Sequence, residues 1–351
     1  MSLVLVASIV GTRPQFIKVA VVDRAIRDPH RHQIIHTGQH YDSDMSGDFF
    51  RQLKIPDPHV HLPLASHGNA AQVGEMIPQL SEQLMECRPD VVLVYGDTNS
   101  TLAGALAAVY SRSFVAHVEA GVRSFERELI EEFNRVVTDH VSDLLFAPDE
   151  RAIQHLSKEG LGARAVLTGD VMHDLVLDTV DLAIRPAVPG LDGDFMLLTI
   201  HRALTADDPD KLAGILTAVA TAHPRVIFPV HPRTRQTMDR HGIRAGAAVT
   251  MIPPVSYLEM LWLERHASII VTDSGGVQRE ASWLGRPCVI LRETTEWADL
   301  IDDRHCLLAG TDPARITEAL RTVDVRPRDV SSLRPRAAER IVRALEERLG
   351  R

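Results

Sequence analysis

Three acidic side chains follow apolar stretches of the sequence, at places where carboxylates could perform acid–base chemistry. Asp97, Glu119 and Glu131 belong to the segments Tyr95-Gly-Asp-Thr-Asn-Ser100, His117-Val-Glu-Ala-Gly-Val-Arg123 and Ile130-Glu-Glu-Phe-Asn-Arg135. Carboxylates at the carboxyl ends of parallel strands gather at one sheet edge and perturb one another's pKa values, as proton transfer requires. A structural alternative makes Asp97 a helix cap and Glu131 an i,i+4 partner of Arg135. Glu119 is harder to explain structurally, because a lone Glu in so apolar a run is costly.

A turn in the second half of the sequence has the features of an anion site. The segment Ile269-Ile-Val-Thr-Asp-Ser-Gly-Gly-Val-Gln-Arg-Glu280 predicts a strand, a turn at Ser274, Gly275 and Gly276, and the start of a helix. Glycines let backbone amides approach an anion, and the helix N-terminus adds partial positive charge. A diphosphate fits this turn, and Glu280 could reach a ribose diol. The alternative is a plain turn with Ser274 as N-cap.

A second turn, Gly11-Thr-Arg-Pro-Gln-Phe-Ile-Lys18, places two cations near the edge of the first predicted sheet. Pro14 suits the first turn of a helix, and Arg13 and Lys18 flank the turn. The alternative is a basic pair on a solvated face. Neither turn matches GxGxxG or GxxxxGK[ST], so the sequence does not support a redox dinucleotide site or a P-loop.

Two histidines follow predicted strands of the second half and are expected to contact a ligand. They are His201, in Leu198-Thr-Ile-His-Arg202, and His231, in Phe228-Pro-Val-His-Pro-Arg233. The alternative for both is a hydrogen-bonded structural histidine. The cluster of His30, His32 and His36 reads as a solvated loop rather than a metal site, and no segment has a typical metal-ligand spacing.

The elements that must position these residues alternate along the chain as strand and helix. This is the βαβ pattern of a parallel sheet covered on both faces, and it occurs twice. The fold class is therefore α/β, with two Rossmann-like doubly wound domains facing a cleft, over 1–180 and 190–332. A Pro- and Gly-rich linker, Arg185–Gly193, separates them, and a charged amphipathic helix follows at Leu333–Leu349. The predicted strands are Leu3–Ile9, Gln33–His36, Val91–Val94, Phe114–His117, Leu144–Ala147, Ala165–Leu167, Met196–Thr199, Arg225–Phe228, Val249–Ile252, Ala267–Thr272 and Cys288–Leu291.

Composition excludes several functional classes. The 351 residues include 38 Lys+Arg and 47 Asp+Glu, a formal charge of −9, so the chain is a poor candidate for nucleic-acid binding. No apolar run approaches the ~18 residues that cross a bilayer. The apolar N-terminus lacks the charged region of a signal peptide and reads as a buried strand. Three widely spaced cysteines favour reduced thiols in the cytoplasm.

Taken in order, the motifs resemble those of the non-hydrolysing UDP-N-acetylglucosamine 2-epimerases. They include, besides the segments above, Thr-Gly-Gln-His at 37–40 and Arg-Glu-Thr-Thr-Glu at 292–296, and they run from residue 11 to about 310. The resemblance implies a glycosyltransferase-B-like fold whose final helix, within 333–351, packs on the first domain. It also implies interconversion of UDP-N-acetylglucosamine (UDP-GlcNAc) and UDP-N-acetylmannosamine (UDP-ManNAc) without metal or redox cofactor, by a cytoplasmic homodimer serving cell-surface polysaccharide synthesis.

The resemblance also assigns roles to individual residues. Residues at the reacting sugar would be Lys18, Asp97, Glu119, Glu131 and His201. The second domain would bind UDP, and the residues that hold the substrate would be Arg13, His231, Tyr257, Ser274, Gly275, Gly276 and Glu280. Gln39 and His40 match positions that, in some bacterial members, contact a second, allosteric UDP-GlcNAc. The expected chemistry is elimination of UDP to a 2-acetamidoglucal and its re-addition.

Departures from the family pattern leave the substrate and the reaction open. His201-Arg-Ala-Leu-Thr205 lacks the usual Glu-Asn, Ile130-Glu-Glu replaces Pro-Glu-Glu, and Thr294-Thr-Glu-Trp-Ala-Asp299 has Trp where many members have Arg-Pro. The Trp, with the Gly-Gln-His-Tyr-Asp run at 38–42, is more typical of relatives that act on UDP-2,3-diacetamido-glucuronate or other modified sugars. Three further functions fit the same fold: a hydrolysing epimerase that releases ManNAc, a glycosyltransferase, and a sensor that binds without turnover.

Overall fold

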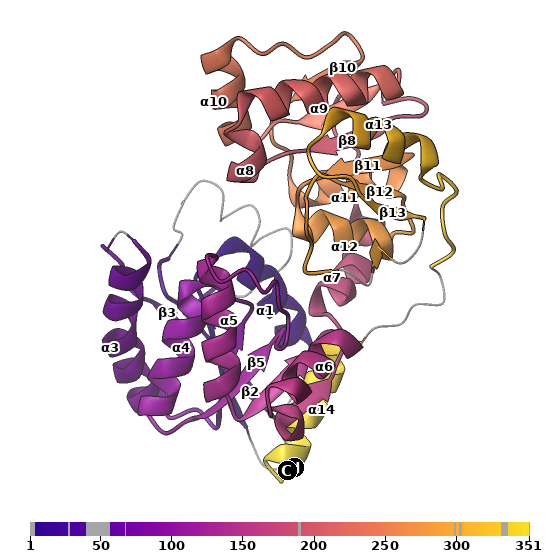
Figure 1. The fold of residues 1–351 in the computed structure, drawn as a ribbon. Coiled ribbons are helices and arrows are strands. Elements are labelled where there is room, and N and C mark those ends of the chain that lie inside the picture. Colours follow the sequence, from indigo (N-terminus) through magenta and orange to yellow (C-terminus); the bar gives the residue numbers. More distant parts are fainter. Residues whose placement is uncertain are drawn as a thin grey trace. The chain divides into compact units, whose positions relative to one another are not determined.

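The chain forms two compact units, one of residues 1–175 with 334–351 and the other of residues 176–333. The computed structural model describes residues 4–26, 29–39, 57–66, 68–188, 191–297, 300–301, 304–330 and 336–350, without the side chain of Arg13. Figure 1 shows each unit as an α/β structure with helices around a sheet. Among the described residues, no helix combines the length and apolar character needed to cross a membrane.

The first unit contains a seven-stranded parallel sheet in the order β3-β2-β1-β4-β5-β6-β7. Its strands are β1 Leu5–Val10, β2 Arg31–His36, β3 Val60–His61, β4 Val91–Tyr95, β5 Phe114–Val118, β6 Leu144–Ala147 and β7 Ala165–Leu167. Its helices are α1 Arg13–Ala25, α3 Asn69–Cys87, α4 Asn99–Tyr110, α5 Ile130–Val141, α6 Glu150–Lys158, the short η1 Gly162–Arg164, most of α7 Val171–Thr179, and α14 Ala337–Arg348.

Helices α3, α4 and α5 pack side by side, and α1 packs with α14 (Figure 1). Strands β1 and β4 are paired in parallel, and their apolar residues are almost entirely buried, as a strand covered on both faces requires. Helix α14 contacts this unit through Glu346, whose carboxylate lies 3.0 Å from Nε2 of His30. The backbone N–H of Ala338 also donates to Asp174, at 2.8 Å. The last helix thus completes the first unit.

The second unit contains a six-stranded parallel sheet in the order β10-β9-β8-β11-β12-β13. Its strands are β8 Met196–Thr199, β9 Val226–Pro229, β10 Val249–Ile252, β11 Ile269–Thr272, β12 Cys288–Ile290 and β13 Cys306–Leu308. Its helices are η2 Val180–Leu182, α8 Ala203–Ala206, α9 Pro209–Ala222, α10 Pro232–His241, α11 Tyr257–His266, α12 Gly275–Trp283 and α13 Pro313–Thr322.

Successive residues of the second sheet enter two different cores. Leu198 and Val271 pack in the cluster that includes α9 and α13, whereas Leu197 and Ile270 pack in the cluster beneath α11 and α12. Because side chains alternate across a strand, both faces of the sheet are covered. The α/β fold class predicted from the sequence is therefore confirmed, twice over. The two-residue strand β3 and the three-residue strand β13 were not predicted.

Candidate functional site

Glu119 lies at the carboxyl edge of the first sheet, directly after β5, in an uncommon backbone conformation. Its φ of +75° falls in the left-handed region, which a residue with a side chain rarely adopts. The backbone N–H groups of Glu119 and Ala120 both donate to the carbonyl of Phe146, at 3.1 Å. The Glu119 carboxylate forms an ion pair with Lys18 of α1, whose side chain is only 9% exposed. Backbone strain of this kind concentrates at functional sites.

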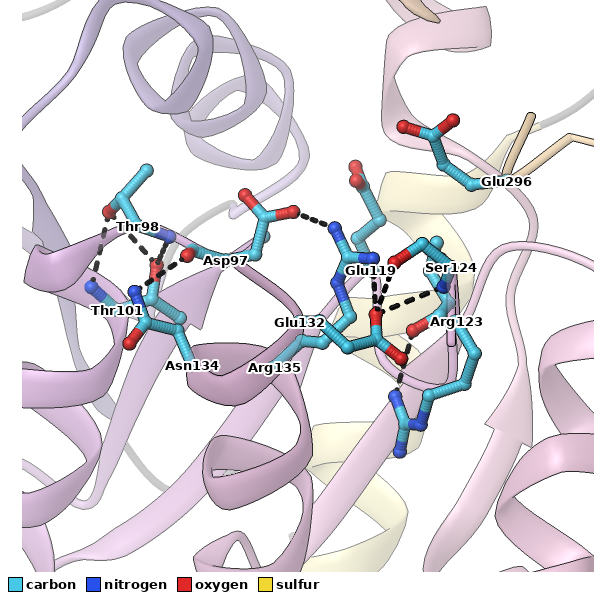
Figure 2. Close-up of polar contacts among 12 residues, drawn as sticks. Asp97, Thr98, Thr101, Glu119, Arg123, Ser124, Glu132, Asn134, Arg135 and Glu296 are labelled. Atoms are coloured by element: carbon cyan, nitrogen blue, oxygen red, sulfur yellow. Dashed lines mark hydrogen bonds and ion pairs between the residues drawn. The ribbon is translucent and has the colours of Figure 1, made fainter. Parts of the chain in front are cut away.

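Asp97, at the end of the neighbouring strand β4, forms an ion pair with Arg135 of α5 (Figure 2). The other terminal nitrogen of the Arg135 guanidinium donates to Glu132, at 2.9 Å. The backbone carbonyl of Asp97 accepts a hydrogen bond from Asn134, at 3.0 Å. Asp97 does not cap the next helix, because Thr98 is the N-cap of α4. The side chain of Asp97 is thus left for the site edge and fixed by a buried arginine.

Glu131 and Glu132 differ in burial at the start of α5. Glu131 is exposed, whereas Glu132 is buried. The Glu132 carboxylate accepts hydrogen bonds from the backbone N–H and the hydroxyl of Ser124 and from the Phe125 N–H, at 2.9–3.0 Å. Burial opposes ionisation of Glu132, but these hydrogen bonds and the Arg135 charge outweigh it and lower its pKa. Arg135 therefore pairs with Glu132 and Asp97, rather than with Glu131.

A second set of charged side chains, centred on Asp139, lies beneath the turns that carry Asp97 and Glu119. Asp139 of α5 is fully buried and accepts hydrogen bonds from His117 Nδ1 at 2.6 Å and from the Gly121 N–H at 3.0 Å. It also contacts Arg123, at 2.7 Å. The other ring nitrogen of His117 lies 2.7 Å from the Gly96 carbonyl. Burial opposes ionisation of Asp139, but His117 and Arg123 lower its pKa, so the carboxylate stays charged.

The first βα turn is closed by polar contacts of small side chains. A Cβ at Gly11 would lie 2.1 Å from the hydroxyls of Ser100 and Thr37, so only glycine fits there. The Gln39 side-chain carbonyl accepts from the Ser100 N–H at 2.9 Å and from its hydroxyl at 2.6 Å. The side chain of Arg13 and all of His40 lie outside the described residues.

In the second unit, the carboxyl edge of the sheet is organised by Asp273, which follows β11 and is fully buried. It accepts hydrogen bonds from the backbone N–H groups of His201 and Arg202, at 3.0–3.2 Å. Nδ1 of His201 also lies 3.2 Å from the same carboxylate. The rings of His201 and His231 are 6.0 Å apart. Burial, together with the charges of His201 and Arg233, lowers the pKa of His231.

Helix α12 begins at this edge with two glycines. Ser274 is its N-cap, and the Ser274 hydroxyl accepts from the Val277 N–H at 3.4 Å. A Cβ at Gly276 would meet no atom closer than 3.9 Å, so neither packing nor a positive φ requires glycine there. Because glycine has no side chain, the backbone N–H groups in the first turn of α12 stay uncovered, and such groups favour an anion.

One turn further along α12, Glu280 lies in a buried acidic cluster with Tyr257 and Glu264 of α11. Burial, the charge of Glu280 and a hydrogen bond with it raise the pKa of Glu264 well above its ordinary value. Burial and the charges of both glutamates likewise raise the pKa of Tyr257. Burial and the neighbouring Glu280 thus favour the protonated form of Glu264.

The segment that departs from the family pattern lies against the start of α12. Glu296 forms ion pairs with Arg292, at 2.6 Å, and Arg202, at 3.4 Å. Burial opposes its ionisation, but Arg292 and Arg202 outweigh it and lower the pKa of Glu296. Trp297 is 7% exposed, and the Arg279 guanidinium stacks over its ring at 3.6 Å.

The structure brings several of the predicted residues together within each unit, whereas Glu131 is exposed on α5. Lys18 and Glu119 form one ion pair, and Asp97 follows the neighbouring strand. In the second unit His201 contacts the aspartate next to Ser274. In the described part of the chain, no group of His, Cys, Asp or Glu has the arrangement of a metal site. Sequence reasoning missed the buried partners Glu132, Asp139, Asp273 and Glu264, and it considered Arg135 only as a partner of Glu131. In α5 the charges at 132, 135 and 139 recur on one helix face, but a solvated face has the same pattern, so the sequence did not single them out.

Two doubly wound units, each with its polar residues at the carboxyl edge of a parallel sheet, define a glycosyltransferase-B-like α/β protein. The fold alone is shared with the calicheamicin glycosyltransferase, at a TM-score of 0.59 and 15% identity over 100% of this chain and 99% of that one. The family model for UDP-N-acetylglucosamine 2-epimerase matches residues 24–346. The chain therefore belongs to the UDP-N-acetylglucosamine 2-epimerase family.

Proteins similar to this chain include enzymes that are named for different UDP-sugars. A UDP-N-acetylglucosamine 2-epimerase homolog of Methanococcus maripaludis is 44% identical over 89% of this chain and 90% of its own length. The UDP-2,3-diacetamido-2,3-dideoxy-D-glucuronate 2-epimerase of Pseudomonas aeruginosa is 43% identical over 90% and 91%. The crystal structure of Methanocaldococcus jannaschii UDP-GlcNAc 2-epimerase in complex with UDP-GlcNAc and UDP has a TM-score of 0.84 at 35% identity, covering 99% and 100%. Similar proteins thus include enzymes for plain and for modified UDP-sugars.

Proposed function

We propose that this protein is a non-hydrolysing 2-epimerase that interconverts UDP-GlcNAc and UDP-ManNAc. The observation that carries the proposal is the Lys18–Glu119 ion pair. It places a carboxylate in a strained turn at the sheet edge that also carries Asp97. Membership of the epimerase family supports the same reaction.

The chemistry explains why such a site is needed. C2 of the sugar is not next to a carbonyl, so its proton is hardly acidic until the C1–O bond to UDP begins to break. In the proposed elimination, a carboxylate takes the C2 proton, UDP leaves C1 with the bonding electron pair, and a C1=C2 double bond forms. UDP oxygen then re-attacks C1 while a proton is delivered to the other face of C2. No atom is lost, and no net oxidation occurs.

The proposed roles divide the site residues into those that exchange the proton and those that bind UDP. Asp97 and Glu119 flank the sugar ring and exchange the C2 proton, with Glu131, His201 and Lys18 assisting. The leaving diphosphate is bound by the turn at Ser274, Gly275 and Gly276 and by two further groups, Arg13 and His231. Glu280, with Tyr257 beside it, accepts hydrogen bonds from the ribose diol.

A second candidate substrate is a UDP-2,3-diacetamido-glucuronate-type sugar. The observation that favours it is Trp297, which stands where many UDP-GlcNAc enzymes of the family have Arg and is anchored under Arg279. The Pseudomonas aeruginosa relative, named for this reaction, is 43% identical to the chain. Both substrates undergo the same proton exchange at C2, so the proposed residue roles are unchanged.

The test is proton NMR of the purified protein in D2O with each UDP-sugar in turn. With UDP-GlcNAc we expect a UDP-ManNAc anomeric signal and deuterium at C2. Glu119→Gln should slow this exchange by about 10²–10⁴-fold, because it removes a proton-transfer group. Glu128→Gln, an exposed neighbour in the same loop, is the matched control and should leave it unchanged.

Different products would identify different functions. Free ManNAc with UDP would identify a hydrolysing enzyme, and turnover only with an added acceptor would identify a glycosyltransferase. Deuterium exchange with the diacetamido-uronate alone would establish the second substrate. Binding of UDP without exchange of either sugar would leave only a sensor.

The resemblance also supports a setting for this reaction. We infer a cytoplasmic homodimer that supplies a sugar nucleotide for cell-surface polysaccharide. Gln39 and His40 would belong to an allosteric UDP-GlcNAc site. Light scattering of the full chain tests the dimer, and a sigmoidal rate curve that Gln39→Ala makes hyperbolic tests the allosteric site.

A further inference from the structure

Asp139 lies beneath the first site and touches none of the residues proposed to meet the sugar. It is fully buried in α5 and receives three donors: His117 Nδ1 at 2.6 Å, the Gly121 N–H at 3.0 Å and Arg123 at 2.7 Å. Arg123 does not need it as a partner, because both oxygens of Glu159 already bind its guanidinium, at 2.7–2.8 Å. Since burying a carboxylate is costly, its other two contacts call for an explanation.

The direct contact fixes the turn that carries Glu119. Glu119 and Gly121 both have positive φ, +75° and +80°. A Cβ at Gly121 would lie 2.5 Å from the Ala152 carbonyl, so this turn is pressed against α6. The Gly121 carbonyl accepts from His155 at 2.9 Å, and its N–H donates to Asp139. A strained turn persists only where such contacts over-determine it.

The indirect contact fixes the turn that carries Asp97. His117 lies on β5, between Asp139 and the carbonyl of Gly96, which is 2.7 Å from its second ring nitrogen. Gly96 has a φ of +65° and directly precedes Asp97. One carboxylate on α5 is thereby linked to the ends of both β4 and β5.

We propose that Asp139 is a positioning residue for both candidate acid–base carboxylates. It holds Glu119 through the Gly121 N–H, and it holds Asp97 through His117 and the Gly96 carbonyl. The inference rests on the proposed function, since it concerns the placement of the groups that exchange the C2 proton. Placement errors of about 1 Å at reacting groups cost on the order of 10²-fold in rate.

The test compares Asp139→Asn with Asp143→Asn in the full chain. Asp143 contacts the same strand at its opposite end, where it accepts from the Val115 N–H at 2.9 Å. We expect Asp139→Asn to lower kcat for C2 exchange about 100-fold. The Kd for UDP, measured by calorimetry, should stay within twofold, because the second unit is proposed to hold UDP. Asp143→Asn should leave both values unchanged.

A milder variant keeps the inference testable if Asp139→Asn does not fold. His117→Gln leaves the bond between Asp139 and Gly121 and disturbs only the contact with Gly96, so kcat should fall by a smaller factor, about tenfold. A general loss of stability would lower the folded fraction but not kcat per folded molecule. Circular dichroism at the assay temperature measures the folded fraction, to which kcat is then normalised. Wild-type kcat in either folded variant overturns the inference. Failure of the wild type to exchange either sugar overturns the proposed function instead.

Discussion

Carboxylates at the edge of the first sheet are held by ion pairs with other side chains, whereas polar groups at the edge of the second sheet are held mainly by hydrogen bonds with the backbone. Asp97 is fixed by Arg135, which is itself fixed by Glu132. In the second unit, Asp273 accepts from two backbone N–H groups, and Ser274 caps a helix that begins with two glycines. The first site thus depends on charged side chains and the second on backbone N–H groups.

The difference suits two different tasks. An acid–base group must keep both its position and its protonation state, and buried partner charges fix both. A diphosphate needs many donors at short range, and backbone amides at a helix start supply them without any side chain. Substitutions of the charged residues around Asp97 should therefore affect chemistry, and substitutions at the start of α12 should affect affinity.

The largest expected effect comes from Arg135→Met. This change removes the cation between Asp97 and Glu132 and leaves Glu132 buried with an uncompensated charge. We expect kcat to fall at least 100-fold and the free energy of unfolding to fall by about 3 kcal/mol, measured by urea titration.

Arg315→Met is the matched control for that stability loss. Arg315 and Glu293 form an ion pair of 2.8 Å, but their side chains are 52% and 65% exposed. Solvent screens such a pair, so the loss should stay below about 0.5 kcal/mol. Equal losses in the two variants would contradict the proposed difference between buried and exposed charge.

Gly276→Ala sharpens the comparison from the other side. A Cβ at this position meets only the Ser274 hydroxyl, at 3.9 Å, and alanine favours a helix by up to about 1 kcal/mol over glycine. We expect unchanged or higher Tm together with about tenfold weaker UDP binding, because the methyl group crowds the amides that would hold the diphosphate. Calorimetry and thermal unfolding measure the two effects.

Gly74→Ala in α3 is its control, since a Cβ there meets no atom within 4 Å. It should raise Tm by a similar amount and leave UDP affinity as it was. Unweakened UDP binding by Gly276→Ala would remove the α12 start from the proposed diphosphate site.

The smallest effect concerns pH and Glu264. Because burial and Glu280 raise the pKa of Glu264, the folded chain keeps a proton that the unfolded chain releases above about pH 4.5. Stability therefore falls as pH rises above that value. Glu264→Gln cannot ionise, so its stability at pH 8 relative to pH 5 should exceed that of the wild type by about 1 kcal/mol. Urea titration at both values measures this, with exposed Glu318→Gln showing no such difference.

The fold was largely predictable, because its strands are apolar runs of standard length with helical patterns between them. Strand β3 escaped prediction, since two residues carry too little periodicity. Strand β13 was also missed, although β7, which has the same length, was predicted. In the site, residues directly after strands were predictable from their position. Their partners on helices were not, because burial of a charge depends on what lies opposite it.

Helix α5 shows this limit most clearly. Its first half is reversed relative to an ordinary amphipathic helix: Glu132 and Arg135 are buried, whereas Ile130 and Phe133 are 38% and 57% exposed. Hydrophobic periodicity alone would turn this helix the wrong way, with Ile130 and Phe133 facing inward. Only the positions of Asp97 and Ser124, on other segments, account for the reversal.

The contribution of α14 to the first unit has a consequence for synthesis on the ribosome. Residues 1–175 emerge first, but the helix that completes their unit follows only after residues 176–333 have been made. At about 5–20 residues per second, that interval is on the order of ten seconds. During it, Val4, Val6 and Ile26, which line a small cavity with Val342 and Leu345 of α14, have no covering helix. The nascent first unit therefore exposes this apolar face until α14 has been made.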